Sequence, residues 1–103
     1  MIKALITKDG TGSIRSFSVK NHGKSIVCAA VSMLVLNTVN SIEAFTKDKF
    51  NCEYDEAGGY LEFSLLSQGA SKSASVLLDA MELGLKSTLD MYPKEISIEY
   101  INK

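Results

Sequence analysis

The sequence predicts an α/β fold of the α+β type, with its elements in the order ββαββαβ. Short segments in which apolar and more polar residues alternate predict strands, and two long segments with helical periodicity predict helices. Glycine-containing turns join four of the strands in two pairs. Because most pairings are hairpins, we expect a mostly antiparallel sheet with two long helices packed on it.

The first hairpin is predicted at the start of the chain. Residues 2–7 alternate as a strand does, and residues 9–12 (Asp-Gly-Thr-Gly) have the composition of a turn. Residues 14–19 then read as the returning strand, which places Phe17 and Val19 on one face.

The second hairpin is predicted in the middle of the chain. Phe50, Cys52 and Tyr54 alternate with polar residues, and residues 55–59 end this strand with a glycine pair. Residues 60–65 follow as its partner strand. We therefore expect Cys52 to be a packing residue of this hairpin.

Two helices and a last strand complete the predicted fold. Ser25 is a candidate N-cap for a helix from Ile26 to about Phe45, and the first half of this helix is apolar on nearly every face. We therefore expect that half to be buried inside the domain. Residues 71–91 form the second predicted helix, which Pro93 ends, and residues 96–100 form the last strand.

Length and charge limit the classes of function. The 103 residues fit a single domain over positions 1–103, and a domain this small gains stability from forming a homodimer. The net charge of −1 does not indicate direct binding to nucleic acid through its phosphates. We expect the partner to be a protein segment.

The cysteine content and the start of the chain indicate the compartment. Met1 leads directly into a predicted strand, so no signal peptide is expected and the location is predicted to be cytoplasmic. Two cysteines and one histidine at these spacings do not make a metal site, and reduced thiols are expected. The apolar run over residues 26–36 is too short to cross a membrane.

Cys28 and His22 are the residues in which chemistry is predicted. Cys28 falls in the first turn of the predicted helix, where the helix dipole favours a thiolate and backbone N–H groups lack partners. An imidazole nearby can take the thiol proton and later return it to a leaving amine. The small side chains of Ala29 and Ala30 leave room for a substrate backbone. The alternative is that Cys28 is a core residue, as buried cysteines often are.

Residues 25–32, Ser-Ile-Val-Cys-Ala-Ala-Val-Ser, with His22 upstream, resemble the ribosomal-processing cysteine protease family (Prp). That family has a Gly-His-Ala element followed by Asp-Ile-Val-Cys-Ala-Ala/Gly-x-Ser. The resemblance extends over the whole chain and includes the opening strand, residues 39–42, the turn at residues 58–60 and the long second helix.

This resemblance implies an α/β homodimer without cofactor or metal. It implies a cysteine endopeptidase that removes a short N-terminal extension from large-subunit ribosomal protein twenty-seven and cuts within a hydrophobic, aromatic-containing stretch. Cys28 matches the nucleophile, His22 the general base and proton donor, and Ser32 the serine one turn beyond the cysteine. The ribosomal protein precursor would then be the partner.

The chain departs from the family pattern just before the cysteine. Asn21 and Gly23 flank the histidine, Ser25 replaces an aspartate, and the interval from histidine to cysteine is shorter. These departures motivate an alternative function, a non-catalytic binding module of the same fold that recognises a ribosomal protein tail. A purely structural domain with Cys28 in its core is a third alternative.

Overall fold

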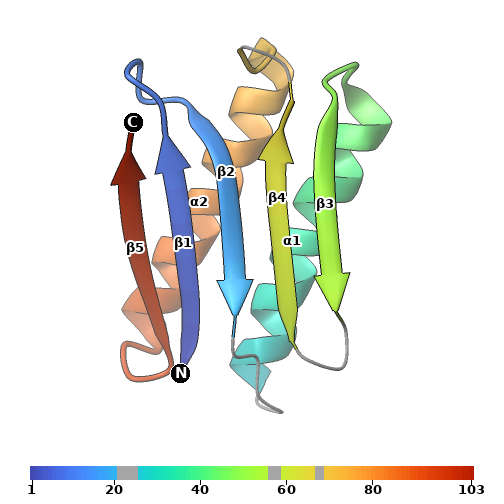
Figure 1. The fold of residues 1–103 in the computed structure, drawn as a ribbon. Coiled ribbons are helices and arrows are strands. Elements are labelled where there is room, and N and C mark those ends of the chain that lie inside the picture. Colours follow the sequence, from blue (N-terminus) through green and yellow to red (C-terminus); the bar gives the residue numbers. More distant parts are fainter. Residues whose placement is uncertain (21–25, 56–58, 67–68) are drawn as a thin grey trace.

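The computed structural model describes residues 1–20, 26–55, 59–66 and 69–103. Within these ranges the chain forms five strands and two helices (Figure 1). In chain order these are β1 (Ile2–Lys8), β2 (Ile14–Lys20), α1 (Ile26–Phe45), β3 (Phe50–Asp55), β4 (Tyr60–Leu65), α2 (Lys72–Met91) and β5 (Ile96–Asn102). The predicted order ββαββαβ is confirmed.

The strands lie in the order β3-β4-β2-β1-β5. The pairs β1 with β2, β2 with β4 and β3 with β4 are antiparallel, and β5 alone is parallel to its neighbour β1. α2 carries the chain from β4 to the far edge of the sheet, so that β5 enters beside β1 and runs in the same direction (Figure 1). The prediction of a mostly antiparallel α+β sheet is confirmed.

Both helices cover the same face of the sheet (Figure 1). Alternate strand residues that point to this face, such as Ile6 and Val19, are buried. Phe17 of β2 stacks on Phe63 of β4, and Phe63 also meets Phe50 of β3, each with ring centroids 5.1 Å apart. The core therefore lies between the sheet and the helix layer, and the opposite face of the sheet is not covered by either helix.

α1 is less buried than the sequence indicated. Its sheet-facing residues, from Val27 to Ile42, are buried, but Ile26 is 79% exposed and Met33 is 69% exposed. The expectation that the first half of this helix is buried inside the domain is therefore wrong. The reason is the two-layer architecture, in which no further layer covers the helix surface that faces away from the sheet.

α1 is also the one helix of the described ranges that is long and apolar enough to cross a membrane by length and composition. It has 20 residues and a mean hydropathy of 1.6 over its apolar window, of which 39% is buried within the structure. The core helix of a soluble domain passes the same test. In this structure α1 packs on the sheet and on α2 through its buried residues.

α2 begins with a serine cap. Ser71 precedes the helix, and its hydroxyl accepts a hydrogen bond from the backbone N–H of Ala74 at 3.1 Å. Further along, α2 comes close to α1 at Gly84, where an added Cβ would lie 2.7 Å from Cδ2 of Leu34. Gly84 therefore allows the two helices to pack closely.

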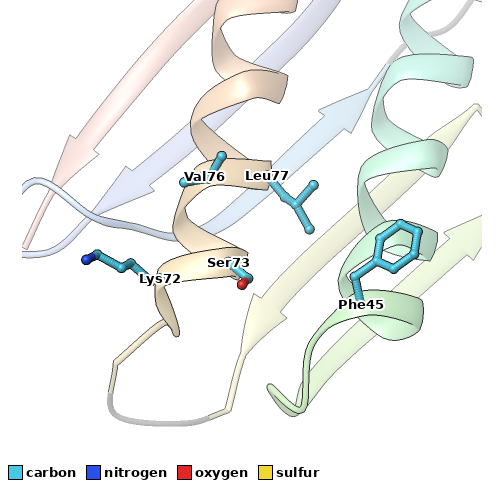
Figure 2. Close-up of a pocket in the computed structure, with 5 residues that line it drawn as sticks. All are labelled: Phe45, Lys72, Ser73, Val76 and Leu77. Atoms are coloured by element: carbon cyan, nitrogen blue, oxygen red, sulfur yellow. The ribbon is translucent and has the colours of Figure 1, made fainter.

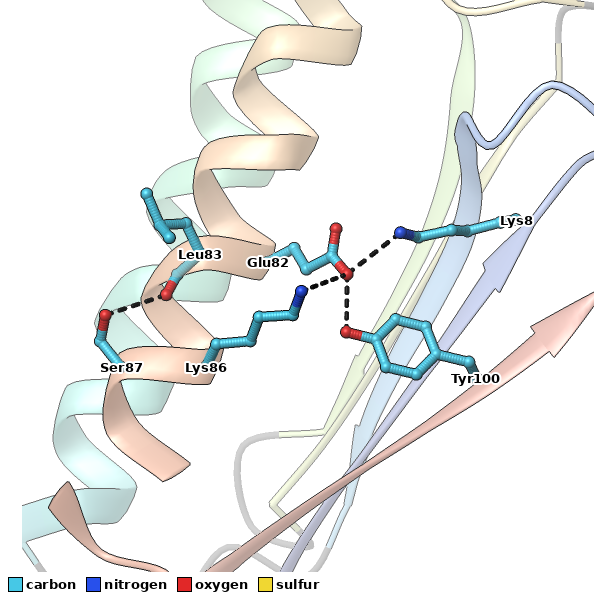
Figure 3. Close-up of polar contacts among 6 residues, drawn as sticks. All are labelled: Lys8, Glu82, Leu83, Lys86, Ser87 and Tyr100. Carbon is cyan, nitrogen blue, oxygen red and sulfur yellow. Dashed lines mark hydrogen bonds and ion pairs between the residues drawn. The ribbon is translucent and has the colours of Figure 1, made fainter. Parts of the chain in front are cut away.

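A polar cluster joins α2 to the β1 and β5 edge of the sheet (Figure 3). Glu82, which is only 7% exposed, accepts a hydrogen bond from the hydroxyl of Tyr100 at 2.6 Å. The same carboxylate oxygen lies 3.1 Å from Nζ of Lys8 and 3.7 Å from Nζ of Lys86. Burial, and then this bond to Glu82, raise the pKa of Tyr100 to about 12, so the phenol remains a donor.

Candidate active site

Cys28 is the third residue of α1 and lies in its first turn, as predicted. Only 4% of the residue is exposed, and its neighbours Val27 and Val31 are buried with it. This end of α1 lies at the same end of the sheet as the last residues of β2 and the first residues of β4 (Figure 1). The thiol is therefore held where the core meets the start of a helix, near backbone N–H groups of the first turn.

The residues next to Cys28 offer an accessible surface. Ala29 and Ala30 are exposed, and so is Ile26 at the start of the helix. Ser32 follows one turn after Cys28 and is half-buried, which places it along the same side of the helix. A peptide can thus approach the first turn of α1 over two small side chains and one large apolar one.

The predicted base lies outside the described residues. His22 and Ser25 fall in residues 21–25, so the distance from the imidazole to the thiol and the proposed cap of α1 stay predictions. The chain length permits contact, because six residue steps can span up to about 20 Å.

Cys52 differs from the expectation that it is a packing residue. It lies on β3 opposite Phe63, but the residue is exposed. β3 is an edge strand whose side chains extend beyond the cover of the helices, which explains the exposure. Partial desolvation nevertheless raises the pKa of the Cys52 thiol. Neither cysteine forms a disulfide.

The part of the chain that the structure describes holds no cluster of three or more histidine, cysteine or acidic side chains able to bind a metal ion.

Two hollows of the surface were not predicted. The first, of about 390 Å³, lies between the end of α1 and the start of α2 and is lined by Phe45, Lys72, Ser73, Val76 and Leu77 (Figure 2). It lies about 25 Å from Cys28, because seventeen residues of helix separate that residue from Phe45. The second, of about 240 Å³, lies on the uncovered sheet face between Leu5 and Glu62. Both hollows form only when distant segments pack together, so the local sequence does not reveal them. The alternation of the strands predicts only which residues lie on the uncovered face of the sheet.

The mostly antiparallel sheet, the helix layer on one face and the free cysteine in the first turn of α1 are compatible with a small enzyme that uses a thiol. The sequence model of the family described as cysteine protease Prp matches residues 1–97. The chain therefore belongs to the Prp family of ribosomal processing cysteine proteases. The resemblance found in the sequence is confirmed.

Individual relatives agree with this assignment. The ribosomal processing cysteine protease Prp of Staphylococcus aureus (strain Mu50 / ATCC 700699) is 26% identical over 106 residues, covering 97% of this chain and 99% of that protein. Its counterpart in Bacillus subtilis (strain 168) is 28% identical over 96 residues, covering 84% of this chain and 86% of that protein.

A solved structure shares the fold over nearly the whole chain. The essential ribosomal processing protease Prp from S. aureus, in complex with a covalently linked product peptide, matches with a TM-score of 0.89 at 26% identity. The match covers 97% of this chain and 99% of that one.

Proposed function

We propose that this cysteine protease removes the N-terminal extension of large-subunit ribosomal protein twenty-seven during ribosome maturation. In this proposal Cys28 is the nucleophile and His22 is the general base and proton donor. The observation that carries the proposal is the place of Cys28 in the first turn of α1, within the residues whose sequence resembles the cysteine motif of the family. The S. aureus relative, which holds a covalently linked product peptide, supports a covalent route.

The proposed reaction has two halves. The imidazole of His22 takes the proton of the Cys28 thiol, and the thiolate attacks the carbonyl carbon of the scissile peptide bond. Backbone N–H groups of the first turn of α1 donate to the developing oxyanion. The C–N bond then breaks, the imidazolium gives its proton to the leaving amine, and a thioester remains on Cys28.

Water completes the proposed cycle. The neutral imidazole takes a proton from a water molecule, whose oxygen attacks the thioester carbonyl carbon. The C–S bond breaks, the peptide leaves with a new carboxylate, and the proton returns to the sulfur. No cofactor is needed for either half, because the thiol, the imidazole and water supply every group that reacts.

Exposed apolar surface near the thiol supports a hydrophobic substrate stretch. Ile26 presents a large side chain two positions before Cys28, while Ala29 and Ala30 leave space for the peptide backbone. An extended peptide that crosses the first turn of α1 can place an apolar or aromatic side chain against Ile26. The carbonyl carbon of the peptide's scissile bond can then lie near the sulfur of Cys28. The precursor of the ribosomal protein is the proposed partner, in the cytoplasm.

A peptide that spans the extension and its junction with the mature ribosomal protein tests the proposed function. We expect the wild-type protein to cut it once, and the Cys28→Ala and His22→Ala variants to leave it intact. Cys52→Ser is the matched control, because it removes the other thiol and should cut at the wild-type rate. Binding of the peptide without cleavage by the wild type would favour the non-catalytic module, and equal cleavage by Cys28→Ala would exclude Cys28 as nucleophile.

We also propose that the protein is a homodimer. Exposed large apolar residues on both helices support this, as does the small size of the domain. Mass measurement in solution, by light scattering or sedimentation, tests it directly.

A further inference from the structure

We propose that the outer edge of β3 is a docking site for the precursor. A basic segment of the mature ribosomal protein, which follows the scissile bond, adds to β3 there as an extra antiparallel strand. The inference rests on the proposed function and gives the same substrate a second contact, away from the thiol. The docking site consists of residues 50–54, which we name the β3 edge.

The backbone of the β3 edge has donors and acceptors that point away from the sheet. β3 is the end strand of the sheet that the described residues form, so it pairs there on one side only. The N–H of Leu66 donates to the C=O of Lys49 at 2.8 Å, and the two residues lie opposite each other in the hairpin register. Opposite residues of an antiparallel ladder alternate between pairs that exchange hydrogen bonds and pairs that do not. The backbone groups of Phe50, Cys52 and Tyr54 therefore point outward.

The β3 edge is open to solvent. Every residue of β3 after Phe50 is exposed, and Tyr54 is 52% exposed. Edge strands are commonly protected by proline, lysine or a β-bulge. β3 contains neither proline nor lysine, and its register with β4 runs from Phe50 to Asp55 without a shift. Outward donors and acceptors in such a row are the template to which an extended peptide adds as a strand.

The direction of β3 fits the segment that follows the scissile bond. β3 runs toward the end of the sheet at which α1 begins, and Cys28 lies in the first turn of α1 (Figure 1). A peptide that leaves the thiol from its N-terminal to its C-terminal side along β3 therefore runs antiparallel to β3. Antiparallel pairing is slightly more stable than parallel pairing, and it is also how β4 pairs with β3. The extension before the scissile bond would have to pair in parallel.

A short connection reaches from the thiol to the β3 edge. α1 begins behind β2 and β4, and β4 is the neighbour of β3 (Figure 1). Adjacent strands lie about 4.8 Å apart and packed layers about 10 Å apart, so the path from Cys28 to a strand added beside β3 is roughly 15 to 20 Å. About five extended residues span this path. The docked segment therefore begins about five residues after the scissile bond.

The charge beside the β3 edge favours a basic segment. Glu53 lies directly opposite Glu62 of β4, on the sheet face away from the helices, and like charges placed so repel each other. A lysine or arginine of an added strand, opposite Glu53, would relieve this repulsion. A ribosomal protein carries such residues because its mature part binds RNA phosphates. A second copy of this chain would instead bring its own Glu53 to the edge.

Amide hydrogen exchange of the Cys28→Ala variant, measured by NMR, tests the docking without cleavage. The probe is a long peptide that contains the extension, the junction and about twelve residues of the mature protein. We expect the three outward amides of the β3 edge to gain at least about tenfold protection. The amides of Asn51 and Glu53, which already face β4, should stay unchanged. A short peptide that ends two residues after the scissile bond is the control and should protect none of them.

Cleavage kinetics measure what the docking contributes. We expect kcat/KM of the wild type to be about tenfold higher for the long peptide than for the short one. Cys52→Pro removes the central outward N–H and no hydrogen bond to β4, so this ratio should fall to about one. Cys52→Ser keeps the N–H and is the matched control for the ratio. Circular dichroism verifies that both variants are folded.

Charge reversal tests the preference for a basic segment. Glu53→Lys should lower the ratio of long to short peptide by about fivefold, because it replaces an attraction by a repulsion. Glu99→Lys is the matched control, since Glu99 is an exposed carboxylate of β5 at the opposite edge of the sheet. It should leave the ratio unchanged.

Failure of the docking site and failure of the proposed function give different results. Equal cleavage of both peptides, without protection of the outward amides, would overturn the docking site and leave the protease standing. Protection of these amides without cleavage of either peptide would overturn the proposed cleavage and support the docking site. Absence of both effects would overturn both proposals. Protection that rises with protein concentration in the absence of peptide would assign the β3 edge to a second copy and overturn the docking site.

Discussion

The two helices of the layer have the same length and opposite characters. α1 has one charged residue, Glu43, and carries the candidate nucleophile, whereas α2 has five charged residues, a serine cap and a buried carboxylate bound to two strands. α1 is held mainly by apolar packing, and α2 by packing together with polar contacts of defined geometry. The difference indicates that α1 carries the reactive residue and that α2 contributes the polar contacts that stabilise the fold.

Replacement of the thiol on α1 should give the largest effect. Cys28→Ser keeps the size of the side chain but supplies a much weaker nucleophile, so we expect kcat/KM on the extension peptide to fall by about a thousandfold or more. The free energy of unfolding should fall by no more than about 1 to 3 kcal/mol, which is the cost of placing a hydroxyl at a buried position. Peptide cleavage and urea denaturation of the same preparation measure both quantities. A large loss of stability would show that Cys28 is mainly a core residue.

The complementary change on α2 is Glu82→Gln. This substitution removes the charge that meets Lys8 and Tyr100, and we expect a loss of about 2 kcal/mol of unfolding free energy. Because Glu82 lies on the other helix and contacts the β1 and β5 edge of the sheet, kcat/KM should stay unchanged at temperatures where the variant is folded. Glu99→Gln, an exposed carboxylate of β5, is the matched control and should have no effect on stability. A fall in kcat/KM without a change in stability would contradict the separation of roles.

The same carboxylate predicts a pH dependence of stability. Burial alone would raise the pKa of Glu82, but the hydroxyl of Tyr100, then Lys8 and then Lys86 outweigh burial and lower the pKa below its ordinary 4.5. A group whose pKa is lowered by folding contributes stability above its unfolded pKa and loses it as the pH falls through the folded value. The stability difference between wild type and Glu82→Gln should therefore be full at neutral pH and shrink in acid. Urea midpoints of both proteins over this range measure it, and a constant difference would contradict it.

Local signals in the sequence predicted the order of the elements. The expectations that were wrong depended instead on tertiary packing. The alternation of residues 2–7 is a local signal, and the strand that it predicted is confirmed. The cap at Ser71 is likewise a contact between residues close in sequence. The exposure of Met33 depends on how many layers cover a helix, and that of Cys52 on which strand lies at the edge. The apolar pattern of a helix surface is the same whether it faces a core or the solvent.

The candidate site was predictable in part. The helix start and the family motif located Cys28 correctly in the first turn of α1. The burial of its thiol and the exposure of Ala29 beside it depend on how the helix sits on the sheet, which the local sequence does not specify. The buried cluster of Glu82 was missed because its partners, Lys8 and Tyr100, come from opposite ends of the chain.

The smallest expected effect lies at the junction of the two helices. The segment after α1 holds the start of α2, because Asp48 accepts a hydrogen bond from the backbone N–H of Ser71 at 2.8 Å. The hydroxyl of Ser71 caps the helix through Ala74, and its hydrogen bond to Asp48, followed by that of the N–H, lowers the pKa of Asp48. Ser71→Ala removes the hydroxyl but keeps the N–H donor, so we expect a loss of about 1 kcal/mol.

Ser73→Ala, an exposed serine of the same first turn, is the control for Ser71→Ala. It should leave stability unchanged or slightly raised, because alanine has the higher helix propensity. Denaturant midpoints of the two variants measure the difference, and equal midpoints would show that the cap contributes nothing. Cys28 lies at the opposite end of α1 from this junction, so cleavage by both variants should match the wild type. The two variants would then alter the stabilising helix and leave the reactive helix unchanged.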